Sequence, residues 1–377
     1  MDGGPEQLEQ QMRTALASLS TPAALAILYC PIDADAAAYA RAIRAVTAAP
    51  LVGATTGGVA FTERGFTRTG VCVGLFGDAN PAVVASMGRD LKRDARAAVA
   101  AALEPIMDRV NVKQKEHSLL ILSDAFAADG EALLDIVRSS VPTHFRVFGG
   151  TAGDNWTFKG TRVILNEEVA SDALVLAGPF TGVPFAAMAR HGFSAVEGGR
   201  EFEITAIDSN VLQSLDCGPA ARVYRDELGR LGLLAPEADL VKAMAIYELG
   251  ARTPFRQELK IRAPLGTNDD GAVILASSLP RRSAVRVVSS SPDKLVQAAH
   301  DVAQRVYRRL RGKPHGALVF DCAARLQLLT DRYGESVHAY RGDGTHPVLG
   351  MACYGEMLRV GGTSDGFHNT TAILAAW

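Results

Sequence analysis

Cys322 and Arg325 point most directly to chemistry, because a thiol and a guanidinium stand three residues apart. They follow apolar residues 317–320, a run typical of a buried strand, so both side chains would lie at the carboxyl end of that strand. The planar fork of a guanidinium binds two carboxylate oxygens at once, which makes Arg325 a candidate clamp for an anion. An ion pair between Arg325 and Glu356 that joins two strand ends is the structural alternative, and the sequence leaves both open.

Cys322 is also a candidate nucleophile, which would need a neighbouring base and a lowered thiol pKa. His368 is the candidate base for this thiol, but the neighbouring Asn369 and Thr370 favour a hydrogen-bonding role for this segment. Most buried cysteines are packing residues. We therefore favour a packed or ligand-contacting Cys322 over a catalytic one.

Two glycine-rich turns, residues 53–58 and 149–153, are candidate binding loops. Neither has the spacing of a phosphate-binding loop or of a dinucleotide fingerprint. Exposed amides in such turns hold anionic or amide groups, with the hydroxyls of Thr55, Thr56 and Thr151 as further partners. The alternative is that these are tight turns in which glycine provides the backbone conformation.

His191 is the candidate for a haem ligand among the eight histidines. It ends an apolar run at an expected boundary between lobes, where cofactor pockets often form. A neutral imidazole is the usual proximal ligand of a sensor haem. A plain surface or hinge histidine is the alternative.

A repeated strand–helix–strand pattern must position these residues. Apolar runs at residues 24–30, 118–124 and 317–322 are each followed by a helical segment, a second strand and a glycine-rich turn. The distance from the tip of the first strand to the first glycine of the turn is similar in each copy, at 23, 26 and 28 residues. Such runs predict parallel strands buried on both faces, with all the tips at the ligand-binding edge of the sheet.

The remaining segments complete the predicted fold. The pattern predicts helices at residues 6–19, 91–110 and 292–310, and mainly strands over residues 162–189. Residues 71–76 and 82–87 are predicted to be a pair of strands joined by a turn at 77–80. A helix is expected at residues 219–228, with Pro219 in its first position.

A shift towards Gly, Ser and Glu at residues 192–199 predicts a boundary between two domains, 1–190 and 191–377. We therefore predict an α/β protein with two lobes. Its mixed sheets would be built from repeated βαβ units with helices packed on them.

Composition excludes several classes of protein. With 39 Lys and Arg against 41 Asp and Glu, the net charge of −2 gives no field that would attract nucleic acid. Five scattered cysteines without a CxxC pair fit neither a disulfide framework nor a zinc site. The polar N-terminus lacks the features of a signal peptide, and glycines and prolines interrupt the uncharged residues 173–189. We expect a cytoplasmic protein without membrane insertion.

Six motifs follow one another along most of the chain. The N-terminal half contains residues 51–58 (LVGATTGG) and 147–154 (VFGGTAGD). The C-terminal half contains residues 215–220 (LDCGPA) followed by Tyr224, residues 316–325 (GALVFDCAAR), residues 353–356 (CYGE) and residues 367–370 (FHNT). In order and spacing, this set resembles the FIST family of prokaryotic sensory modules, which have an N-terminal and a C-terminal part.

The resemblance implies a sensor of small molecules such as amino acids. The chain length leaves no room for an output domain, so we expect a separate partner such as a histidine kinase. A subset of stand-alone members of the family is regarded as haem proteins that sense nitric oxide and regulate a partner kinase, and this second interpretation would use His191. An enzyme with Cys322 as nucleophile is the third. The residues expected to bind a ligand are Thr55, Thr56, Gly150, Thr151, Cys322, Arg325, Tyr354, Glu356, His368 and Asn369.

Overall fold

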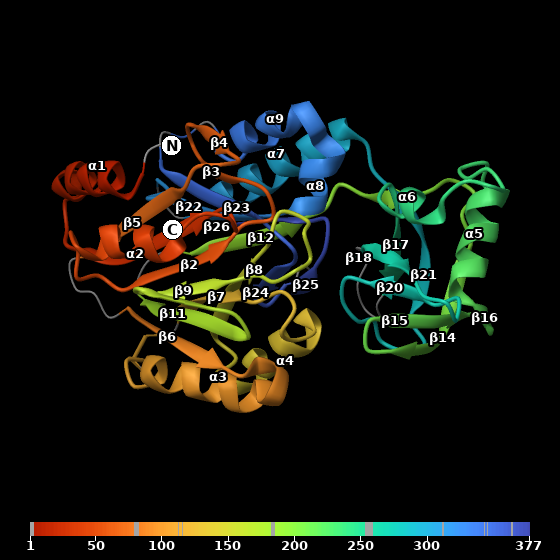
Figure 1. Ribbon diagram of the computed structural model, residues 1–377, viewed down its shortest axis with the longest axis horizontal. Coiled ribbons are helices and arrows are strands. Elements are labelled where there is room, and N and C mark those ends of the chain that lie inside the picture. The colour runs from red at the N-terminus through yellow and green to blue at the C-terminus, as the bar shows by residue number, and fades with distance from the viewer. Residues whose placement is uncertain are drawn as a thin grey trace.

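The computed structural model describes residues 4–78, 83–111, 113, 114, 116–181, 185–252, 259–310, 313–342, 344, 346–362 and 365–377. A larger body and a smaller lobe lie side by side (Figure 1). The chain forms the body up to Arg190, builds the lobe from residues 194–289, and returns to the body from Pro292 onward. Within the described residues, every helix is too short or too polar to cross a lipid bilayer.

Three βαβ units repeat within the body. They are β1 (Ala23–Cys30), α2 (Ala36–Arg44) and β2 (Leu51–Thr55); β7 (His117–Ser123), α4 (Gly130–Ser140) and β8 (Phe145–Thr151); and β22 (Ala317–Cys322), α8 (Ala323–Leu329) and β23 (Val348–Cys353). The two strands of each unit are parallel, and the last residue of one is the register partner of the last residue of the other. The predicted repeat is therefore confirmed.

Three mixed sheets contain these units in the described part of the chain. The first has the order β10 (Glu168–Ala170), β9 (Val163–Leu165), β2, β1, β5 (Cys72–Gly77). The second has the order β25 (Gly366–His368), β24 (Glu356–Arg359), β8, β7, β11 (Ala173–Thr181), β6 (Val84–Arg89). The third has the order β12 (Ala186–Arg190), β26 (Ala372–Ala376), β22, β23, β3 (Ala60–Thr62), β4 (Gly65–Thr67).

The three sheets enclose a common core, and helices cover their outer faces. Ile27, Leu122 and Phe320, one from each repeated unit, are fully buried in this core. The first sheet is covered by α1 (Pro5–Ser18) and α2, and the second by α3 (Leu91–Met107) and α4. The third is covered by α7 (Pro292–Arg309), α8 and α9 (Tyr333–Ala339), with the short 3-10 helix η1 (Thr330–Arg332) between the last two. Burial of both faces explains why the central strands are continuously apolar.

The lobe has a sheet and a core of its own. Its strands follow the order β18 (Lys260–Arg262), β17 (Tyr247–Arg252), β21 (Ala284–Ser289), β14 (Glu201–Asp208), β15 (Val211–Leu215), β20 (Val273–Leu275), β19 (Pro264–Thr267), with β13 (Ser194–Ala195) beside β21 and β16 (Gly218–Pro219) beside β15. The helices α5 (Ala220–Arg230) and α6 (Leu240–Met244) pack on this sheet around Leu212, Tyr224 and Val287. Pro219 is the N-cap of α5, so the helix begins at Ala220, one position after the first helical residue that we predicted.

Polar residues set where the helices after the strands begin. The side chains of Asp35 and Asp129 accept hydrogen bonds from the amides of Ala38 and Ala132, which caps α2 and α4. The cap of α4 holds the loop between β7 and α4 at the side of the body that faces the lobe (Figure 1).

The glycine-rich turns of the three units interlock at the carboxyl ends of their strands. The amide of Gly57 donates to the Ala352 carbonyl at 2.7 Å, that of Gly153 to Thr55 at 2.8 Å, and that of Thr151 to Gly355 at 2.8 Å. A Cβ atom on Gly153 would lie 2.3 Å from the backbone nitrogen of Gly57, so this approach requires glycine. The expectation that these amides are free to bind an anion is corrected, because neighbouring units use them.

The predicted pairing of the strands near residues 71–76 and 82–87 is wrong. β5 pairs with β1 in the first sheet, whereas β6 pairs with β11 at the edge of the second. Residues 79 and 80 of the expected turn lie outside the described residues. Alternation identifies strands but cannot tell a hairpin from a chain that crosses between two sheets.

The division into domains 1–190 and 191–377 stays a prediction, and the sheets cross it. β12 pairs with β26 in the third sheet, and β24 pairs with β8 in the second. Residues from both sides of position 190 therefore build the body, while residues 194–289 form the lobe.

Candidate ligand-binding cavity

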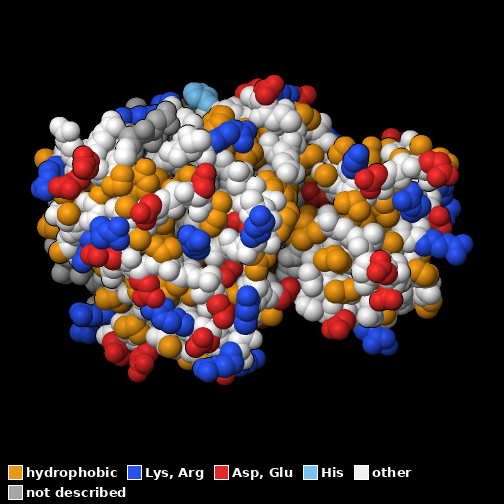
Figure 2. Space-filling model, in the orientation of Figure 1, with side chains coloured by type: hydrophobic (Ala, Val, Ile, Leu, Met, Phe, Trp, Pro, Cys, Tyr) orange, Lys and Arg blue, Asp and Glu red, His pale blue; other side chains and the backbone are white. Residues whose placement is uncertain are grey.

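A cavity of about 450 Å³ lies where the body meets the lobe. The space-filling view shows a furrow between these two parts, with hydrophobic side chains along it (Figure 2). The body contributes Ala125, Phe126, Ala127, Ala128, Asp129, Gly130, Thr151, Trp156, Phe158, Cys322, Ala323, Ala324, Tyr354, Phe367 and Asn369. The lobe contributes Ser209, Asn210, Ala263, Leu265, Leu275 and Ala276. A molecule bound here would contact both parts.

The cavity opens at the carboxyl ends of two of the three βαβ units. Thr151 ends β8, Cys322 ends β22, and Tyr354 follows β23 directly. Open α/β sheets bind ligands at this edge, because the loops that leave the strands meet there. The predicted location is thus where the cavity lies, although the first unit contributes no lining residue among those described.

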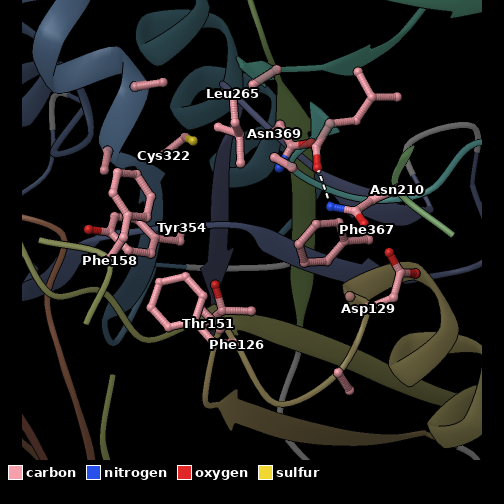
Figure 3. A pocket seen from close by; sticks show the side chains of 18 of the residues that line it. Phe126, Asp129, Thr151, Phe158, Asn210, Leu265, Cys322, Tyr354, Phe367 and Asn369 are labelled. Carbon is pink, nitrogen blue, oxygen red and sulfur yellow. Dashed lines mark hydrogen bonds between the residues drawn. The ribbon is translucent and has the colours of Figure 1, made fainter. Parts of the chain in front are cut away.

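Four aromatic side chains gather on one side of the cavity. The rings of Phe158 and Tyr354 stack with centroids 5.6 Å apart, and Phe126 and Trp156 lie 6.0 and 5.6 Å from Tyr354. Phe126 is 40% exposed and Phe158 is 51% exposed, which is unusual for phenylalanine. Figure 3 shows Phe126, Phe158 and Tyr354 opposite Phe367, Asn210 and Asp129. These rings offer a ligand an exposed apolar surface.

Hydrogen bonds hold this aromatic group in place. The Tyr354 hydroxyl donates to Asp154 Oδ1 at 2.6 Å and accepts from the Trp156 amide at 2.5 Å. Asp154 also accepts from the amides of Phe158, Lys159 and Gly160, so one carboxylate fixes the loop that carries Phe158. Burial opposes ionisation of Asp154, but these hydrogen bonds, led by that of Tyr354, keep its pKa below the ordinary value.

Asn369 and Thr151 carry polar atoms that have no hydrogen-bond partner among the described residues. Asn369 is 1% exposed, yet neither its Oδ1 nor its Nδ2 makes a hydrogen bond. Thr151 is 4% exposed, and its Oγ1 is likewise unpaired. A buried polar atom without a partner costs about 1–3 kcal/mol. The unmet hydrogen-bonding capacity of this wall is what a bound ligand would satisfy.

Two acidic residues at the start of α4 connect the body to the lobe beside the cavity. Asp129 Oδ2 accepts from the Ser277 hydroxyl at 2.9 Å and from the Ser278 amide at 2.8 Å. Glu131 pairs with Lys260 and Arg262, each at 2.6 Å. Although burial opposes it, hydrogen bonds from Ala132, Ser278 and Ser277 hold the pKa of Asp129 below its ordinary value.

A second connection lies behind Asn369. Thr370 Oγ1 donates to both carboxylate oxygens of Glu248, at 2.7 and 2.8 Å, and Glu248 belongs to the lobe strand β17. Glu248 is 1% exposed. Burial raises its pKa to about 8, and the hydrogen bond from Thr370 opposes that change only in part. Glu248 is therefore mostly protonated at neutral pH.

Of the residues predicted to bind a ligand, the structure brings Thr151, Cys322, Tyr354 and Asn369 together at the cavity. Thr55 and Thr56 are buried in the interlocked turns, where Thr55 Oγ1 accepts from the Arg162 amide. Gly150 lies inside the second sheet as the register partner of Glu356. Phe367 and Asn369 line the cavity, whereas His368, which lies between them in the sequence, does not. Successive side chains along an extended chain point to opposite sides.

Arg325 and Glu356 occupy positions other than those expected. Arg325 is fully buried, and its Nε donates to Asp321 Oδ1 at 2.5 Å while Nη2 donates to the Leu295 carbonyl. It pairs with Asp321 instead of Glu356, because it lies on the face of α8 that packs on α7, away from Ala323 and Ala324 in the cavity wall. Glu356 accepts from Cys353 and from the Thr371 amide. The clamp and the Arg325–Glu356 pair are both corrected.

Cys322 lacks the lowered thiol pKa that an activated nucleophile needs. Burial raises its pKa well above the ordinary value, and the neighbouring Glu356 raises it further. His368, the expected base, does not line the cavity with it. The thiol therefore contributes a small, weakly polar surface to the wall.

His191 does not fit the role of a haem ligand in this cavity, because it does not line it. Its Nδ1 accepts from the Phe193 amide at 2.9 Å, and burial together with Arg190 and Arg325 lowers its pKa to about 4. The next residue, Gly192, packs against α7 so closely that a Cβ atom would lie 2.7 Å from the Lys294 carbonyl oxygen. His191 thus lies outside the candidate cavity, and the haem interpretation stays a prediction.

Sequence reasoning missed the aromatic side chains of Phe126, Trp156 and Phe158 and the contributions of Asp129 and Asn210. Phe126 and Asp129 lie on the loop that leaves the carboxyl end of β7, and Cys322 was chosen because it lies at the carboxyl end of the equivalent strand of another unit. Their position directly after a predicted strand is the feature by which the sequence could have identified them. Asn210 lies in a turn of the lobe and carried no signal.

Two family models match the chain. The model described as FIST N domain matches residues 24–217, and the model described as FIST C domain matches residues 220–359. No curated protein matches it. The junction of the two matches falls inside the lobe, between β15 and α5, so both matched regions supply residues to the body, the lobe and the cavity.

Proposed function

Because the chain belongs to the FIST family of small-molecule sensory domains, which are associated with signal transduction, we propose that it is a cytoplasmic sensor that acts on a separate signalling protein. A small organic molecule would bind in the cavity between body and lobe. The signalling partner would be a protein such as a histidine kinase, and amino acids or similar metabolites are the first ligands to test.

The observation that carries this proposal is the buried amide of Asn369. Both of its polar atoms lack a partner in the described part of the chain, and Asn369 belongs to the wall of a cavity that body and lobe share. Proteins rarely bury an amide in this way without water or a ligand to satisfy it. The aromatic surface of Phe126 and Phe158 next to it supports the same conclusion, since a ligand would cover it.

The arrangement also supplies a means of signalling. A ligand that contacts Tyr354 of the body and Leu265 of the lobe would bind more tightly to the arrangement in which the two lie close together. A ligand shifts a conformational equilibrium only by this difference in affinity. The contacts at Asp129, Glu131 and Glu248 are those that would strengthen or loosen as the lobe moves.

A thermal-shift screen of amino acids, organic acids, amines and heterocyclic metabolites tests the proposal. Ala324→Phe fills the cavity from its wall, and Ala100→Phe on the exposed face of α3 is the matched control. At a ligand concentration of 100 times Kd, stabilisation is about 2.7 kcal/mol. We expect such stabilisation in the wild type and in Ala100→Phe, and its loss in Ala324→Phe. Stabilisation that Ala324→Phe leaves unchanged would contradict the proposed site.

A further inference from the structure

The charges of the residues that line the cavity disfavour an anionic ligand. Among the described lining residues there is no lysine, arginine or histidine, and the one carboxylate, that of Asp129, already accepts hydrogen bonds from Ala132, Ser277 and Ser278 instead of facing a ligand cation. The nearby guanidinium of Arg262 is fully buried and already bound to Glu131, to the Phe367 carbonyl and to the Ser278 carbonyl. An anionic ligand would lose its water without gaining a cation, which is unfavourable. Carboxylates and phosphates are thus poor ligands here.

The walls are specific about shape. Alanine side chains at positions 263, 276, 323 and 324 form low surfaces, and the rings of Phe126, Phe158 and Tyr354 form one side. Aromatic side chains bind flat rings by stacking or edge-to-face contact. The volume of about 450 Å³ lies in the lower part of the usual range for ligand pockets, about 300–1,000 Å³, so it accommodates a molecule of one or two rings.

The amide of Asn369 favours a ligand with a particular hydrogen-bonding edge. Its amide offers a donor and an acceptor side by side, and both are unpaired. A partner with an adjacent acceptor and donor satisfies both atoms at once, as when asparagine pairs with the edge of adenine. Thr151 offers one more hydroxyl for the same purpose.

We propose that the cavity selects an uncharged planar ring that carries an amide-like edge, meaning a hydrogen-bond donor beside an acceptor. Such a ring would stack on the aromatic group of Phe126, Phe158 and Tyr354 and, once the side chains that cover the Asn369 amide move aside, form two hydrogen bonds with it. This inference rests on the proposed function and names the ligand class of the same site. Nucleobases and aromatic carboxamides both present this chemistry.

Matched probes distinguish the contribution of the amide-like edge to the affinity from that of the ring. Isothermal titration of the full chain would use nicotinamide as the aromatic carboxamide, with adenine and hypoxanthine as the nucleobases. Nicotinate replaces the amide by a carboxylate, 3-methylpyridine keeps the ring without the edge, and L-phenylalanine is a charged amino acid with a ring. We expect at least one amide-edged probe to bind about tenfold or more tightly than all three of these controls, and the ranking of the carboxamide against the nucleobases identifies the source.

Variants then assign the contacts. Asn369→Leu keeps the size of the side chain but removes both hydrogen bonds, and we expect it to weaken the preferred probe about 10- to 100-fold. Thr151→Val is a second, isosteric variant in case Asn369→Leu does not fold, and we expect a smaller loss of several fold. Ala324→Phe should abolish binding of the same probe.

The outcomes distinguish the ligand class from the site. Preferential binding of nicotinate or L-phenylalanine that Ala324→Phe abolishes would overturn the ligand class and leave the sensor intact. Unchanged affinity of the preferred probe in Asn369→Leu would also overturn it. If neither these probes nor any compound of the thermal-shift screen binds in a manner sensitive to Ala324→Phe, both this inference and the proposed function fail.

Discussion

Replacement of Glu248 by glutamine should remove a pH dependence of stability that the contact between lobe and body creates. The Glu248 carboxyl is 1% exposed and has Thr370 as its hydrogen-bond donor. Its pKa is raised from 4.5 to about 8, mainly by burial. The folded protein therefore holds a proton that the unfolded chain releases between these two pH values.

The sign and size of the effect follow from this difference. Because the folded state binds more protons than the unfolded state between pH 4.5 and about 8, the free energy of unfolding falls as pH rises through that window and levels off above it. The slope is about 1.4 kcal/mol for each pH unit. Between pH 6 and 8 the wild type should lose roughly 2 kcal/mol more than Glu248→Gln, whose amide does not titrate, because the slope is already flattening near pH 8.

Urea denaturation followed by circular dichroism at pH 6, 7, 8 and 9 measures this difference. Glu237→Gln, which removes an exposed carboxylate of the same lobe, is the matched control. We expect the stability difference between wild type and Glu248→Gln to change steadily with pH, and that between wild type and Glu237→Gln to stay nearly constant. Parallel curves for wild type and Glu248→Gln would refute the assignment of a buried, protonated Glu248.

Three further predictions concern the walls of the cavity. Glu131→Gln removes the carboxylate that Lys260 and Arg262 share. Because Arg262 would then be buried without its ion-pair partner, we expect the protein to lose about 3–5 kcal/mol of stability and the amides of residues 260–262 to exchange hydrogen faster. Unchanged exchange would contradict this connection. Tyr354→Phe removes the hydroxyl that donates to Asp154, and we expect it to lower stability by about 1–3 kcal/mol and to increase proteolysis within residues 154–160. Equal proteolysis of the wild type and the variant would argue against a role of this hydroxyl in holding the loop. At pH 7.5, iodoacetamide should label Cys322 far more slowly than the exposed Cys217, since burial raises the pKa of the Cys322 thiol. Peptide mass spectrometry measures the two labelling rates, and faster labelling of Cys322 would support its role as a nucleophile.

The sequence was informative wherever one physical requirement dominates. Residues 24–30, 118–124 and 317–322 must be apolar because their strands are buried on both faces, so the three βαβ units could be predicted. The glycines of the turns were identified as well, but the reason for them differs from the one expected. Gly153 is required by the close approach of Gly57, a contact between segments nearly 100 residues apart that no local pattern reveals.

Predictions failed where the partner of a residue was decided by packing over long distances. Arg325 follows its strand at the expected place, but one turn of α8 directs it to Asp321 and away from the cavity. β5 and β6 alternate like a hairpin, yet their partners β1 and β11 lie in different sheets. The lobe side of the cavity, including Asn210 and Leu265, could not be predicted because it depends on how two folded parts meet.

The fluorescence of Trp156 offers the most direct test of whether a ligand binds between body and lobe. Trp156 lines the cavity, whereas the chain's other tryptophan, Trp377, is buried in the core among the three sheets. Titration with a compound that raises the melting temperature should change the emission saturably in the wild type, with no such change in Trp156→Phe or Ala324→Phe. A stabilising compound that leaves Trp156 emission unchanged, or that acts equally on Ala324→Phe, would show that the ligand binds elsewhere and contradict the account.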